Sequence, residues 1–509
     1  MSLAIELSPQ QQAVVDWVRT GTGNGYVEAV AGSGKTTALL ACCAATHLPV
    51  QFAAFNRKIA DEIGARAEAM GLKHVKVGTF HSFGLAAWKR LHPEVQAGAP
   101  AGLAKRGEAF NLAHTPGGQR AALSRLVGFC KQSALPPARV TGEALAELIE
   151  RFGLESDFPQ AADPAALEAL AGDTARLLQA HITLSRAYLD FDDMIYMPVI
   201  EPACTIRTSP WVMVDEAQDT NEARRELAWR MTDSRGGRML FVGDRNQAIY
   251  GFSGADADAV ERIKDAASCH EMPLTVTYRC PRAIVERAAA IVPEITAHPS
   301  APAGKVRETP LMLDGVHFTL RERLKPVDAI LCRNTAPLVR TALQILQQGT
   351  ACQVEGRDIG KSLDQLIVKI TAGGEGQLPY MLDALRRYEA AEIEILNAAG
   401  APYKAQSVSD RCDTIRALCE DLDPGRGSVR ALRLRIEELF RDTDGPGRRI
   451  LTLSTVHKAK GREWPRVFLL HHSTLMPSRR ARPGWELDQE HNLMYVAYTR
   501  AQSELVFVE

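Results

Sequence analysis

The sequence predicts an α/β protein of two domains, each a parallel sheet with flanking helices and each interrupted by a mainly helical insertion. Three observations lead to this fold class. A glycine-rich turn joins a strand to a helix at Tyr26–Leu40. Further short apolar runs alternate with helical segments in both halves of the chain, which is typical of parallel strands with crossover connections. The 509 residues also exceed the roughly 250–300 that one hydrophobic core usually supports.

The bulk composition is ordinary for a globular protein, with 46% hydrophobic and 24% charged residues. No apolar run approaches the ~20 residues that span a bilayer, and the N-terminus lacks the pattern of a signal peptide. We therefore expect no membrane partner and a cytoplasmic location. The ten cysteines contain no CxxC pair, which argues against a zinc site or a disulfide framework. A net charge of −1 excludes a globally basic coating protein, so nucleic-acid binding would need local patches and stacking.

The stretch Tyr26–Leu40 has the chemistry of a phosphate cradle. Its glycines let backbone N–H groups turn towards a triphosphate, and the following helix adds the positive end of its dipole. Lys35 can reach the β- and γ-phosphates, and the Thr36 hydroxyl can hold Mg²⁺. Ala29 replaces the usual first glycine, but Lys-Thr directly after Gly-x-Gly has no packing rationale in an ordinary strand–helix turn. We predict a P-loop NTPase site. Its nucleotide-binding residues are Ala31, Gly32, Ser33, Gly34, Lys35, Thr36 and Thr37.

Strands and helices alternate through the first half of the chain. The segment Leu7–Gln12 starts a helix. Alanine-, leucine- and arginine-rich helices then occupy residues 86–186. We assign residues 1–85 and 187–271 to the first domain and 86–186 to its helical insertion. The predicted strands of this half are Tyr26–Val30, Val50–Phe55, His74–Gly78, Trp211–Val214 and Met239–Val242.

A second α/β region starts near Met272. We assign residues 272–370 and 450–509 to this domain and 371–449 to its insertion. Within the insertion, Met381–Leu396 and Thr414–Leu422 have helical apolar spacing, which predicts a compact helical cap. The predicted strands of this half are Leu274–Thr277, Ala329–Cys332, Ile450–Leu453, Val467–Leu470 and Leu505–Val508.

Two acids follow the buried strand Trp211–Val214. A carboxylate at a strand end beside a P-loop suits Mg²⁺, which prefers octahedral oxygen ligands, and we assign this role to Asp215. Glu216 is then the base that orients and deprotonates the attacking water. An Asp-Glu pair after a strand can also simply start a loop. Its place downstream of a P-loop, followed by Ala-Gln-Asp, favours the catalytic interpretation.

Seven segments in order resemble the superfamily 1A helicases of the UvrD/Rep/PcrA type. They are AVAGSGKT, TFHS, VDEAQDT, GDRNQAIYGFSGA, TYRC, TVHKAKGREW and YVAYTRA. Details such as AFNRKIADE and EHNLMYVAYTRA look closest to the F-box DNA helicase branch. The resemblance implies two RecA-like P-loop motor domains that use ATP and Mg²⁺ to move 3′ to 5′ on single-stranded DNA. The implied partners are single-stranded DNA and single/double-strand junctions, with the protein acting as a monomer.

The resemblance also implies roles at the nucleotide. Paired arginines supplied from another domain would stabilise the charge of phosphoryl transfer and link hydrolysis to domain closure. The implied residues are Gln11 and Tyr278 for adenine, Glu463 for the ribose, and Gln247, Arg279 and Arg500 for the γ-phosphate, beside the catalytic Lys35, Asp215 and Glu216.

For the nucleic acid, a motor that does not read sequence should use aromatic stacking and backbone contacts. Each aromatic residue alone could instead be part of the core, most of all Phe80 and Tyr250. The positions implied by the resemblance are Phe80, His81, Tyr250, Phe252, His457 and Lys458.

Two functions remain open from the sequence. The first is a translocating helicase. The second is an ATP-gated clamp that remodels a nucleoprotein complex without net unwinding. The complete set of Glu216, Gln247, Arg279 and Arg500 indicates hydrolysis and so favours the motor.

Overall fold

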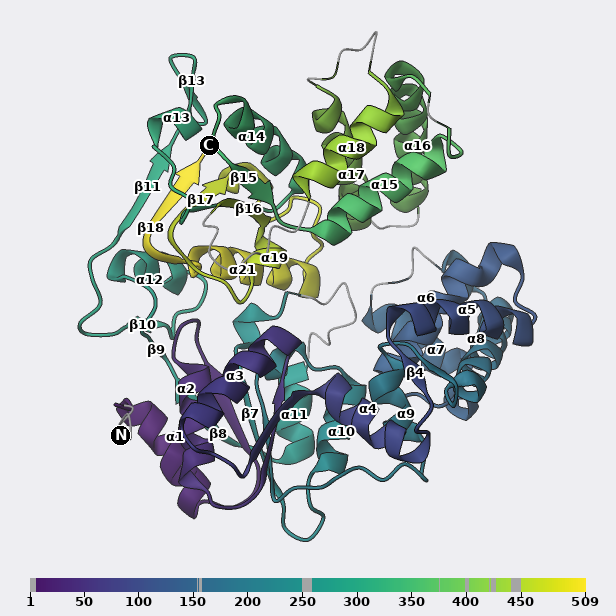
Figure 1. Ribbon diagram of the computed structural model, residues 1–509, viewed down its shortest axis with the longest axis vertical. Helices are drawn as coiled ribbons and strands as arrows, with labels where there is room; N and C mark the ends of the chain where they lie inside the picture. The colour runs from purple at the N-terminus through teal and green to yellow at the C-terminus, as the bar shows by residue number, and fades with distance from the viewer. Residues whose placement is uncertain are drawn as a thin grey trace. The chain divides into compact units, whose positions relative to one another are not determined.

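The computed structural model divides into two compact units, Met1–Thr275 and Val276–Glu509. It describes residues 6–152, 154, 158–249, 259–374, 376–398, 402–420, 422, 427–440 and 450–509. Each unit contains a large parallel sheet with helices around it, which confirms the predicted fold class (Figure 1).

A six-stranded sheet forms the centre of the first unit, in the order β3-β2-β6-β7-β1-β8. All its neighbouring strands run parallel, as crossover helices require. The strands are β1 (Gly25–Ala29), β2 (Val50–Ala54), β3 (Val75–Thr79), β6 (Trp211–Val214), β7 (Arg238–Gly243) and β8 (His270–Leu274). The helices beside them are α1 (Pro9–Thr20), α2 (Lys35–Ala45), α3 (Arg57–Ala69), α4 (Phe80–Leu91), α9 (Asp193–Ile200), α10 (Glu222–Met231) and α11 (Ala259–Ala267).

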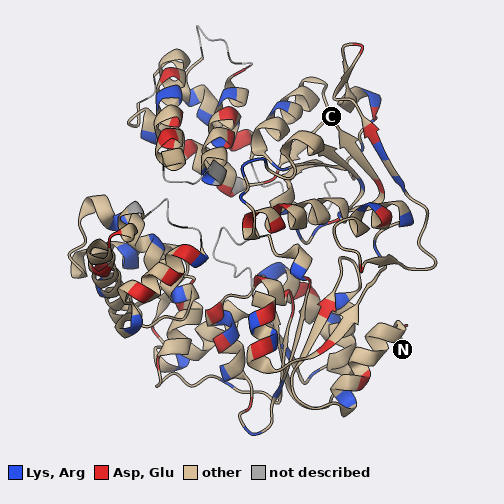
Figure 2. Ribbon diagram, turned by 180° about the vertical axis from the view of Figure 1, so that it is seen from behind, with Lys and Arg blue, Asp and Glu red and all other residues tan. Residues whose placement is uncertain are grey.

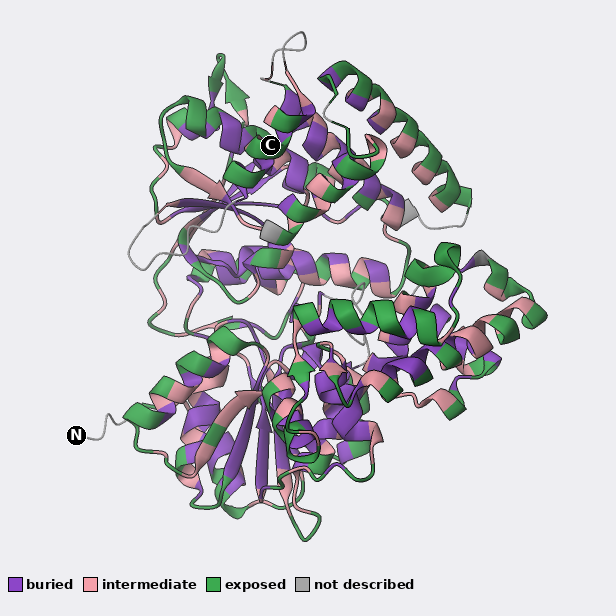
Figure 3. Ribbon diagram, turned by 45° about the vertical axis from the view of Figure 1, so that its right-hand side comes forward, coloured by how far each residue is buried: buried purple, intermediate pink, exposed green. Residues whose placement is uncertain are grey.

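Alternate residues of the inner strands β2, β6, β7 and β1 enter two separate apolar layers, because side chains of a strand point to opposite faces. On β7, Leu240 and Val242 pack with α1, α2 and α3. Met239 and Phe241 pack with α4, α9, α10 and α11 on the other face. Both faces are therefore covered, which explains why the central strands β6 and β7 contain continuous apolar runs in the sequence. Figure 3 shows the same contrast between buried strands and helices that are exposed on one side.

The first unit ends at Thr275, later than the predicted residue 271. The cause is β8, which pairs with β1 from His270 to Leu274. The predicted strand Leu274–Thr277 is consequently split, since Leu274 ends β8 and β9 (Val276–Thr277) begins in the second unit.

The insertion of the first unit is helical, and two short strands lie at its base. The boundary predicted between residues 85 and 86 falls inside α4, which runs on to Leu91. Trp88 of α4 packs in the same apolar cluster as the insertion helices. The elements are β4 (Gln96–Ala97), α5 (Ala99–Leu112), α6 (Arg120–Gln132), α7 (Gly142–Arg151), α8 (Pro164–Leu184) and β5 (Tyr188–Leu189).

The second unit holds a six-stranded parallel sheet in the order β11-β18-β17-β14-β16-β15. The strands are β11 (Lys305–Thr309), β14 (Ala329–Cys332), β15 (Cys352–Val354), β16 (Leu451–Thr455), β17 (Trp464–Leu470) and β18 (Ala501–Val508). The helices are α12 (Arg282–Ala289), α13 (Phe318–Arg321), α14 (Thr335–Gln347), α19 (Val456–Ala459), α20 (His472–Leu475) and α21 (Trp485–Tyr498). Smaller strands are β10 (Thr296–Ala297), which pairs with β9, and the hairpin β12 (Met312–Leu313) and β13 (Val316–His317).

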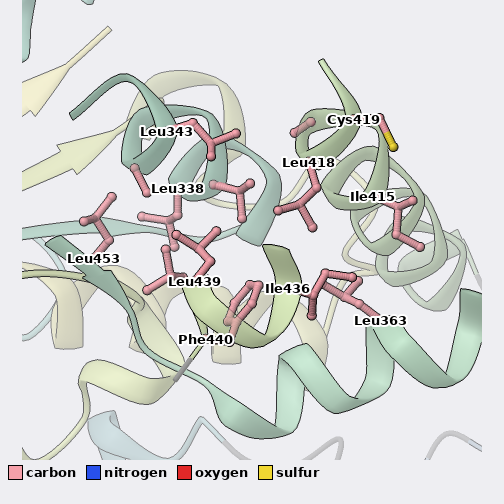
Figure 4. Packing of buried hydrophobic residues seen from close by; sticks show 14 of the residues in the cluster. Leu338, Leu343, Leu363, Ile415, Leu418, Cys419, Ile436, Leu439, Phe440 and Leu453 are labelled. Atoms are coloured by element: carbon pink, nitrogen blue, oxygen red, sulfur yellow. The ribbon is translucent and has the colours of Figure 1, made fainter. Parts of the chain in front are cut away.

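Within its described residues, the insertion of the second unit forms no apolar core separate from that of the sheet. Its helices share one apolar cluster with α14 and with the sheet, as Figure 4 shows for Leu338 of α14, Leu418 of α17, Ile436 of α18 and Leu453 of β16. The helices are α15 (Arg357–Ile370), α16 (Leu378–Ala398), α17 (Pro402–Cys419) and α18 (Val429–Leu439).

A half-buried carboxylate ties this insertion to α14 beside the sheet. Both oxygens of Asp410 on α17 accept the Thr335 backbone N–H at 3.0 Å, and one accepts that of Ala336 at 3.2 Å. Asp410 thus caps the N-terminus of α14 from a helix that lies far away in the sequence.

Charged side chains of both signs are interspersed along the helices of both units (Figure 2). This pattern agrees with the net charge of −1. Among the described residues, none of the helices combines the length and apolar character that a membrane crossing needs.

Candidate nucleotide site and nucleic-acid residues

The phosphate loop joins β1 to α2. Gly32 and Gly34 have φ angles of +74° and +78°, a backbone region that glycine enters without strain. A Cβ atom at Gly34 would lie 2.6 Å from Nε2 of Gln11. This loop therefore has a fixed shape that depends on its glycines, and it leads directly into the first turn of α2 at Lys35.

Gln11 holds this loop from α1. Its Nε2 donates to the Ser33 carbonyl at 3.0 Å, and its Oε1 accepts the Ser8 backbone N–H at 3.0 Å. One N–H and one lone pair of the amide remain for a ligand. The predicted adenine contact of Gln11 stays a prediction, but its support of the loop is a role that the sequence did not suggest.

The residues present fit a bound triphosphate. The Ser33 side chain is buried, and among the described residues its hydroxyl has no hydrogen-bond partner. A buried hydroxyl normally has one. An anion held at the N-terminus of α2 would supply an acceptor to the Ser33 hydroxyl and a counter-charge to Lys35.

Two acids follow β6, whose residues are all buried. The Glu216 backbone N–H donates to Oδ1 of Asp215 at 2.9 Å, and Lys35 Nζ donates to Oε2 of Glu216 at 3.2 Å. Glu216 also has a φ of +51°, which is unusual for a residue with a side chain. Backbone strain of this kind tends to collect at functional sites.

Gln218 links these acids to the end of β7, and the sequence analysis missed it. Its Nε2 donates to Oε2 of Glu216 at 2.6 Å, and its Oε1 accepts the Asp244 backbone N–H at 3.0 Å. Asp244 in turn accepts Nε2 of Gln247 at 2.6 Å. The ends of β6 and β7 are thus joined by a continuous hydrogen-bonded chain that begins at Lys35. The sequence feature that could have indicated Gln218 is its position two residues after the predicted base, in the segment that follows a strand.

Replacing Gln218 by Ala should lower the ATP turnover number about 10- to 100-fold with little change in ATP affinity, since the carboxylate of the base would lose the amide that orients it. Steady-state ATPase assays beside binding of a fluorescent ATP analogue measure both quantities. Gln12→Ala is the matched control, because Gln12 is bonded to Asp16 on the exposed side of α1. Unchanged turnover in Gln218→Ala would contradict the role.

The electrostatics of this cluster suit a divalent cation. Burial, and then the charge of Glu216, raises the pKa of Asp215 to about 7. Burial raises the pKa of Asp244 to about 6, against the opposing charge of Lys35. Burial lowers the pKa of Lys35, but Glu216, Asp244 and Asp215 together raise it above its ordinary value. Three carboxyl groups thus surround one ammonium, and hard oxygen donors with excess negative charge fit Mg²⁺.

Metal affinity should therefore depend on pH. Asp215 must lose its proton to bind a cation, and with a pKa of about 7 it is mostly protonated at pH 6 and mostly ionised at pH 8. We expect Mn²⁺, used as a probe for Mg²⁺, to bind the nucleotide-free protein about tenfold more weakly at pH 6 than at pH 8. Electron paramagnetic resonance of free Mn²⁺ measures this. Asp215→Asn should bind weakly at both values, and a pH-independent affinity of the unaltered protein would refute the assignment.

Two of the nucleotide residues predicted in the second unit, Arg279 and Glu463, pair with each other in this structure. Arg279 forms an ion pair with Glu463, and Oε1 of Glu463 accepts Nε2 of Gln502 at 2.8 Å. Tyr278 is 46% exposed and lies 4.8 Å, centroid to centroid, from the His298 ring. An exposed ring supported from behind can stack on a base, whereas Arg279 and Glu463 would have to part before either could bind nucleotide.

Arg500 lies in the interior of the second unit. Its Nε donates to the Val496 carbonyl at 2.9 Å, and its two terminal nitrogens donate to the Arg462 carbonyl at 3.2 Å and to the Thr499 hydroxyl at 3.0 Å. A role at the γ-phosphate would require this guanidinium to leave its backbone partners. That role stays a prediction.

The predicted nucleic-acid residues divide into three groups. Phe80 is 5% exposed and packs in the same apolar layer as α9 and α10, so stacking on a base would require its ring to leave this layer. That role stays a prediction. His81 is half-buried, and burial followed by the charge of Arg224 lowers its pKa to about 4, which keeps the ring neutral. Tyr250 and Phe252 lie outside the described residues.

The remaining pair, His457 and Lys458, lies on α19. Burial, and then the charge of Arg333, lowers the pKa of His457 to about 4. Lys458 is exposed, and its Nζ donates to Oδ2 of Asp358 at 2.6 Å. A surface ion pair of this kind is weak and can be exchanged for a phosphate contact.

Phe191 is an aromatic residue that the sequence analysis passed over. Its side chain is 56% exposed, and its ring meets His81 edge-on at 6.1 Å. The signal was present in the sequence, because a phenylalanine among three aspartates, Asp190-Phe191-Asp192-Asp193, has charged neighbours that oppose its burial. Together, His81 and Phe191 form an aromatic face on the first unit.

Comparison with known proteins agrees with this geometry. Residues 7–268 match the sequence model described as the UvrD/REP helicase N-terminal domain, and residues 432–509 match the UvrD-like helicase C-terminal domain. The chain is 28% identical over 301 residues to ATP-dependent DNA helicase PcrA of Leuconostoc citreum, which covers 54% of this chain and 38% of the relative. It is 27% identical over 369 residues to ATP-dependent DNA helicase UvrD2 of Mycobacterium tuberculosis, covering 62% and 51% respectively.

A third relative belongs to the branch named from the motifs. F-box DNA helicase protein 1 of Schizosaccharomyces pombe is 23% identical over 316 residues, covering 58% of this chain and 33% of the relative. The chain thus spans between about one third and one half of the length of these relatives. Since the first of the two family matches, residues 7–268, takes in more than half of its 509 residues, the chain belongs to the UvrD/REP helicase family.

Proposed function

We propose that this protein is an ATP-driven DNA helicase and translocase that moves 3′ to 5′ on single-stranded DNA. The observation that carries the proposal is the hydrogen-bonded chain from Lys35 through Glu216 and Gln218 to Asp244 and Gln247. It links a phosphate loop to a candidate base and to a γ-phosphate sensor. The names of the relatives, all ATP-dependent or F-box DNA helicases, support the same activity.

Hydrolysis would use these residues in turn. Lys35 turns from Glu216 to the β- and γ-phosphates, which frees the Glu216 carboxylate for water. The water oxygen bonds to the γ-phosphorus, its proton passes to Glu216, and the bond to the bridging oxygen breaks to release ADP. Thr36 and Asp215 would hold Mg²⁺, which neutralises charge on the phosphates. Gln247 would detect the loss of the γ-phosphate.

Coupling to movement would come from the second unit. Arg279 and Arg500 belong to that unit, whereas Lys35 belongs to the first, so the predicted roles of these residues would involve both units in hydrolysis. Parting of the Arg279–Glu463 ion pair would release an arginine for the γ-phosphate and a carboxylate for the ribose. Bound DNA that favours this rearrangement would stimulate hydrolysis.

The partners follow from the same proposal. Single-stranded DNA and single/double-strand junctions would bind a monomer through His81, Phe191, Tyr250, Phe252 and α19. All ten cysteines lie in the described part of the chain as free thiols, which supports a reducing compartment such as the cytoplasm.

A direction-resolved unwinding assay tests the proposal. Duplexes with a 3′ or a 5′ single-stranded tail are mixed with protein and ATP, and strand separation is followed beside ATP hydrolysis. We expect DNA-stimulated hydrolysis and separation of the 3′-tailed duplex only. Hydrolysis without separation of either duplex would favour the ATP-gated clamp, and separation of only the 5′-tailed duplex would reverse the proposed polarity.

A further inference from the structure

Three buried charged side chains and one half-buried carboxylate, that of Asp190, lie together at the base of the first insertion. Lys105 of α5 donates to Oδ2 of Asp193 at 2.6 Å, and Lys131 of α6 contacts Oδ2 of Asp190 at 2.7 Å and Oδ1 of Asp193 at 2.8 Å. Lys105 and Asp193 are fully buried, and Lys131 is 2% exposed. Counted by formal charge, these two lysines and two aspartates balance each other.

Three residues of this cluster are also arranged as metal ligands could be. Ligand atoms of His181, Asp190 and Asp193 all lie within 4.8 Å of one another. Lys131 Nζ, however, already contacts all three residues, since it also lies 3.3 Å from Nδ1 of His181. Burial, and then the charges of Lys131 and Lys105, lowers the pKa of His181 to about 2, so the ring stays neutral and can accept from an ammonium. A lysine thus fills the position of a cation.

Such a cluster is a costly way to hold helices together. Buried ion pairs repay their desolvation only in good geometry, and apolar side chains of the same volume often stabilise a core as well or better. What charged pairs add is a single defined arrangement. Here that arrangement joins α5 and α6 to the turn from Asp190 to Asp193.

The turn itself is closed by reciprocal bonds. The Asp193 backbone N–H donates to Oδ1 of Asp190 at 2.8 Å, and the Asp190 N–H donates to Oδ2 of Asp193 at 2.9 Å. Each of these carboxylates also binds a buried lysine. The residue next to Asp190 inside the turn is Phe191, whose exposed ring lies edge-on to His81. The backbone on both sides of Phe191 is therefore fixed by the cluster.

We propose that Lys105 and Lys131 are positioning residues for nucleic-acid binding, which fix the Asp190–Asp193 turn so that Phe191 stands beside His81 as a stacking face for a base. The inference rests on the proposed function, because it takes single-stranded DNA as the ligand. A neutral aromatic face with one exposed ring, that of Phe191, suits any base and needs no sequence readout. Neither lysine touches the DNA.

The test measures binding of a fluorescent oligothymidine by anisotropy without nucleotide, beside the melting temperature and the affinity for an ATP analogue. Phe191→Ala should weaken DNA binding about 5- to 100-fold, the worth of one stacked base. Lys131→Met should weaken it by a similar factor, and the double variant no further. Lys131→Arg should restore much of the affinity. Lys73→Met removes an exposed charge elsewhere on the unit and should bind as the unaltered protein does.

A second variant controls for the possibility that Lys131→Met does not fold. Lys131→Met with Asp190→Asn removes one charge of each sign, so no extra unpaired charge is buried. It should keep ATP-analogue binding and still bind the oligonucleotide weakly. Normal DNA affinity in either folded lysine variant would overturn this inference and leave the proposed function standing. Additive losses in Lys131→Met/Phe191→Ala would do the same. If the unaltered protein does not bind the oligonucleotide, the proposed function fails together with it.

Discussion

Glu216→Gln is expected to bind ATP normally and to hydrolyse it at least ~10² times more slowly, the scale of a lost general base. Glutamine is nearly isosteric and can keep the bond to Gln218, whereas it cannot accept a proton from water. Lys35→Ala should instead lose ATP affinity and activity together, because Lys35 is the cation of the phosphate loop and the partner of Glu216 at 3.2 Å.

Single-turnover hydrolysis and analogue binding separate these two outcomes. Glu226→Gln is the matched control, since Glu226 is an exposed residue of α10 that pairs with Arg230. Its turnover should equal that of the unaltered protein. A Glu216→Gln protein with normal turnover would remove Glu216 as the base and leave the hydrogen-bonded chain with a structural role only.

Leu418→Ala is expected to destabilise the whole second unit, by about 2–5 kcal/mol. Leu418 lies on α17 of the insertion, but its side chain is fully buried in the cluster that also contains Ile330 of β14 and Leu453 of β16. The cavity would therefore open in the core of the sheet domain. Unfolding by urea, followed by fluorescence and by circular dichroism, should show one cooperative transition for this unit that moves as a whole.

Leu434→Ala is the matched control, because Leu434 of α18 is 52% exposed and such surface changes usually stay within about 0.5 kcal/mol. Exchange of residues 371–449 for a Gly/Ser linker should leave the second unit unfolded, since it removes much of this core. A separate early transition for the insertion, or a folded deletion variant, would contradict the shared core.

The compact cap predicted for residues 371–449 is therefore helical but not separable. Its helices follow from apolar spacing in segments such as Met381–Leu396. The spacing shows which face is buried but not which surface buries it, and the partner here is α14 with the sheet. Point changes at Asp410, which ties α17 to α14, therefore test the role of this insertion better than its deletion does.

The phosphate site was largely predictable, because its chemistry needs particular residue types at a strand end. Gly34, Lys35 and Asp215 each have few alternatives at such a place. Gln218 was not predictable, since an amide can bond to almost anything and only the fold brings Asp244 to it. Phe80 shows the reverse case, in which a motif position serves the core.

The burial of Lys105 and Lys131 could not be predicted from the sequence, for a different reason. Lysine and aspartate are rarely buried, so single positions in α5, α6 and the Asp190–Asp193 turn suggest solvated surface. Only the pairing of residues from separate segments makes their burial possible, and no local pattern records it. Phe191, by contrast, could have been found from its charged neighbours.

The shared core of the second unit determines how this unit behaves when its chain is cut. β16 lies between β14 and β15 in the sheet, while the helices that precede it bury their apolar faces against α14. A nick between α18 and β16 would leave two pieces, neither of which can cover its own apolar surface. Expressed separately, such halves should reassemble by complementation, and proteolysis at this point would leave a nicked protein whose fragments copurify.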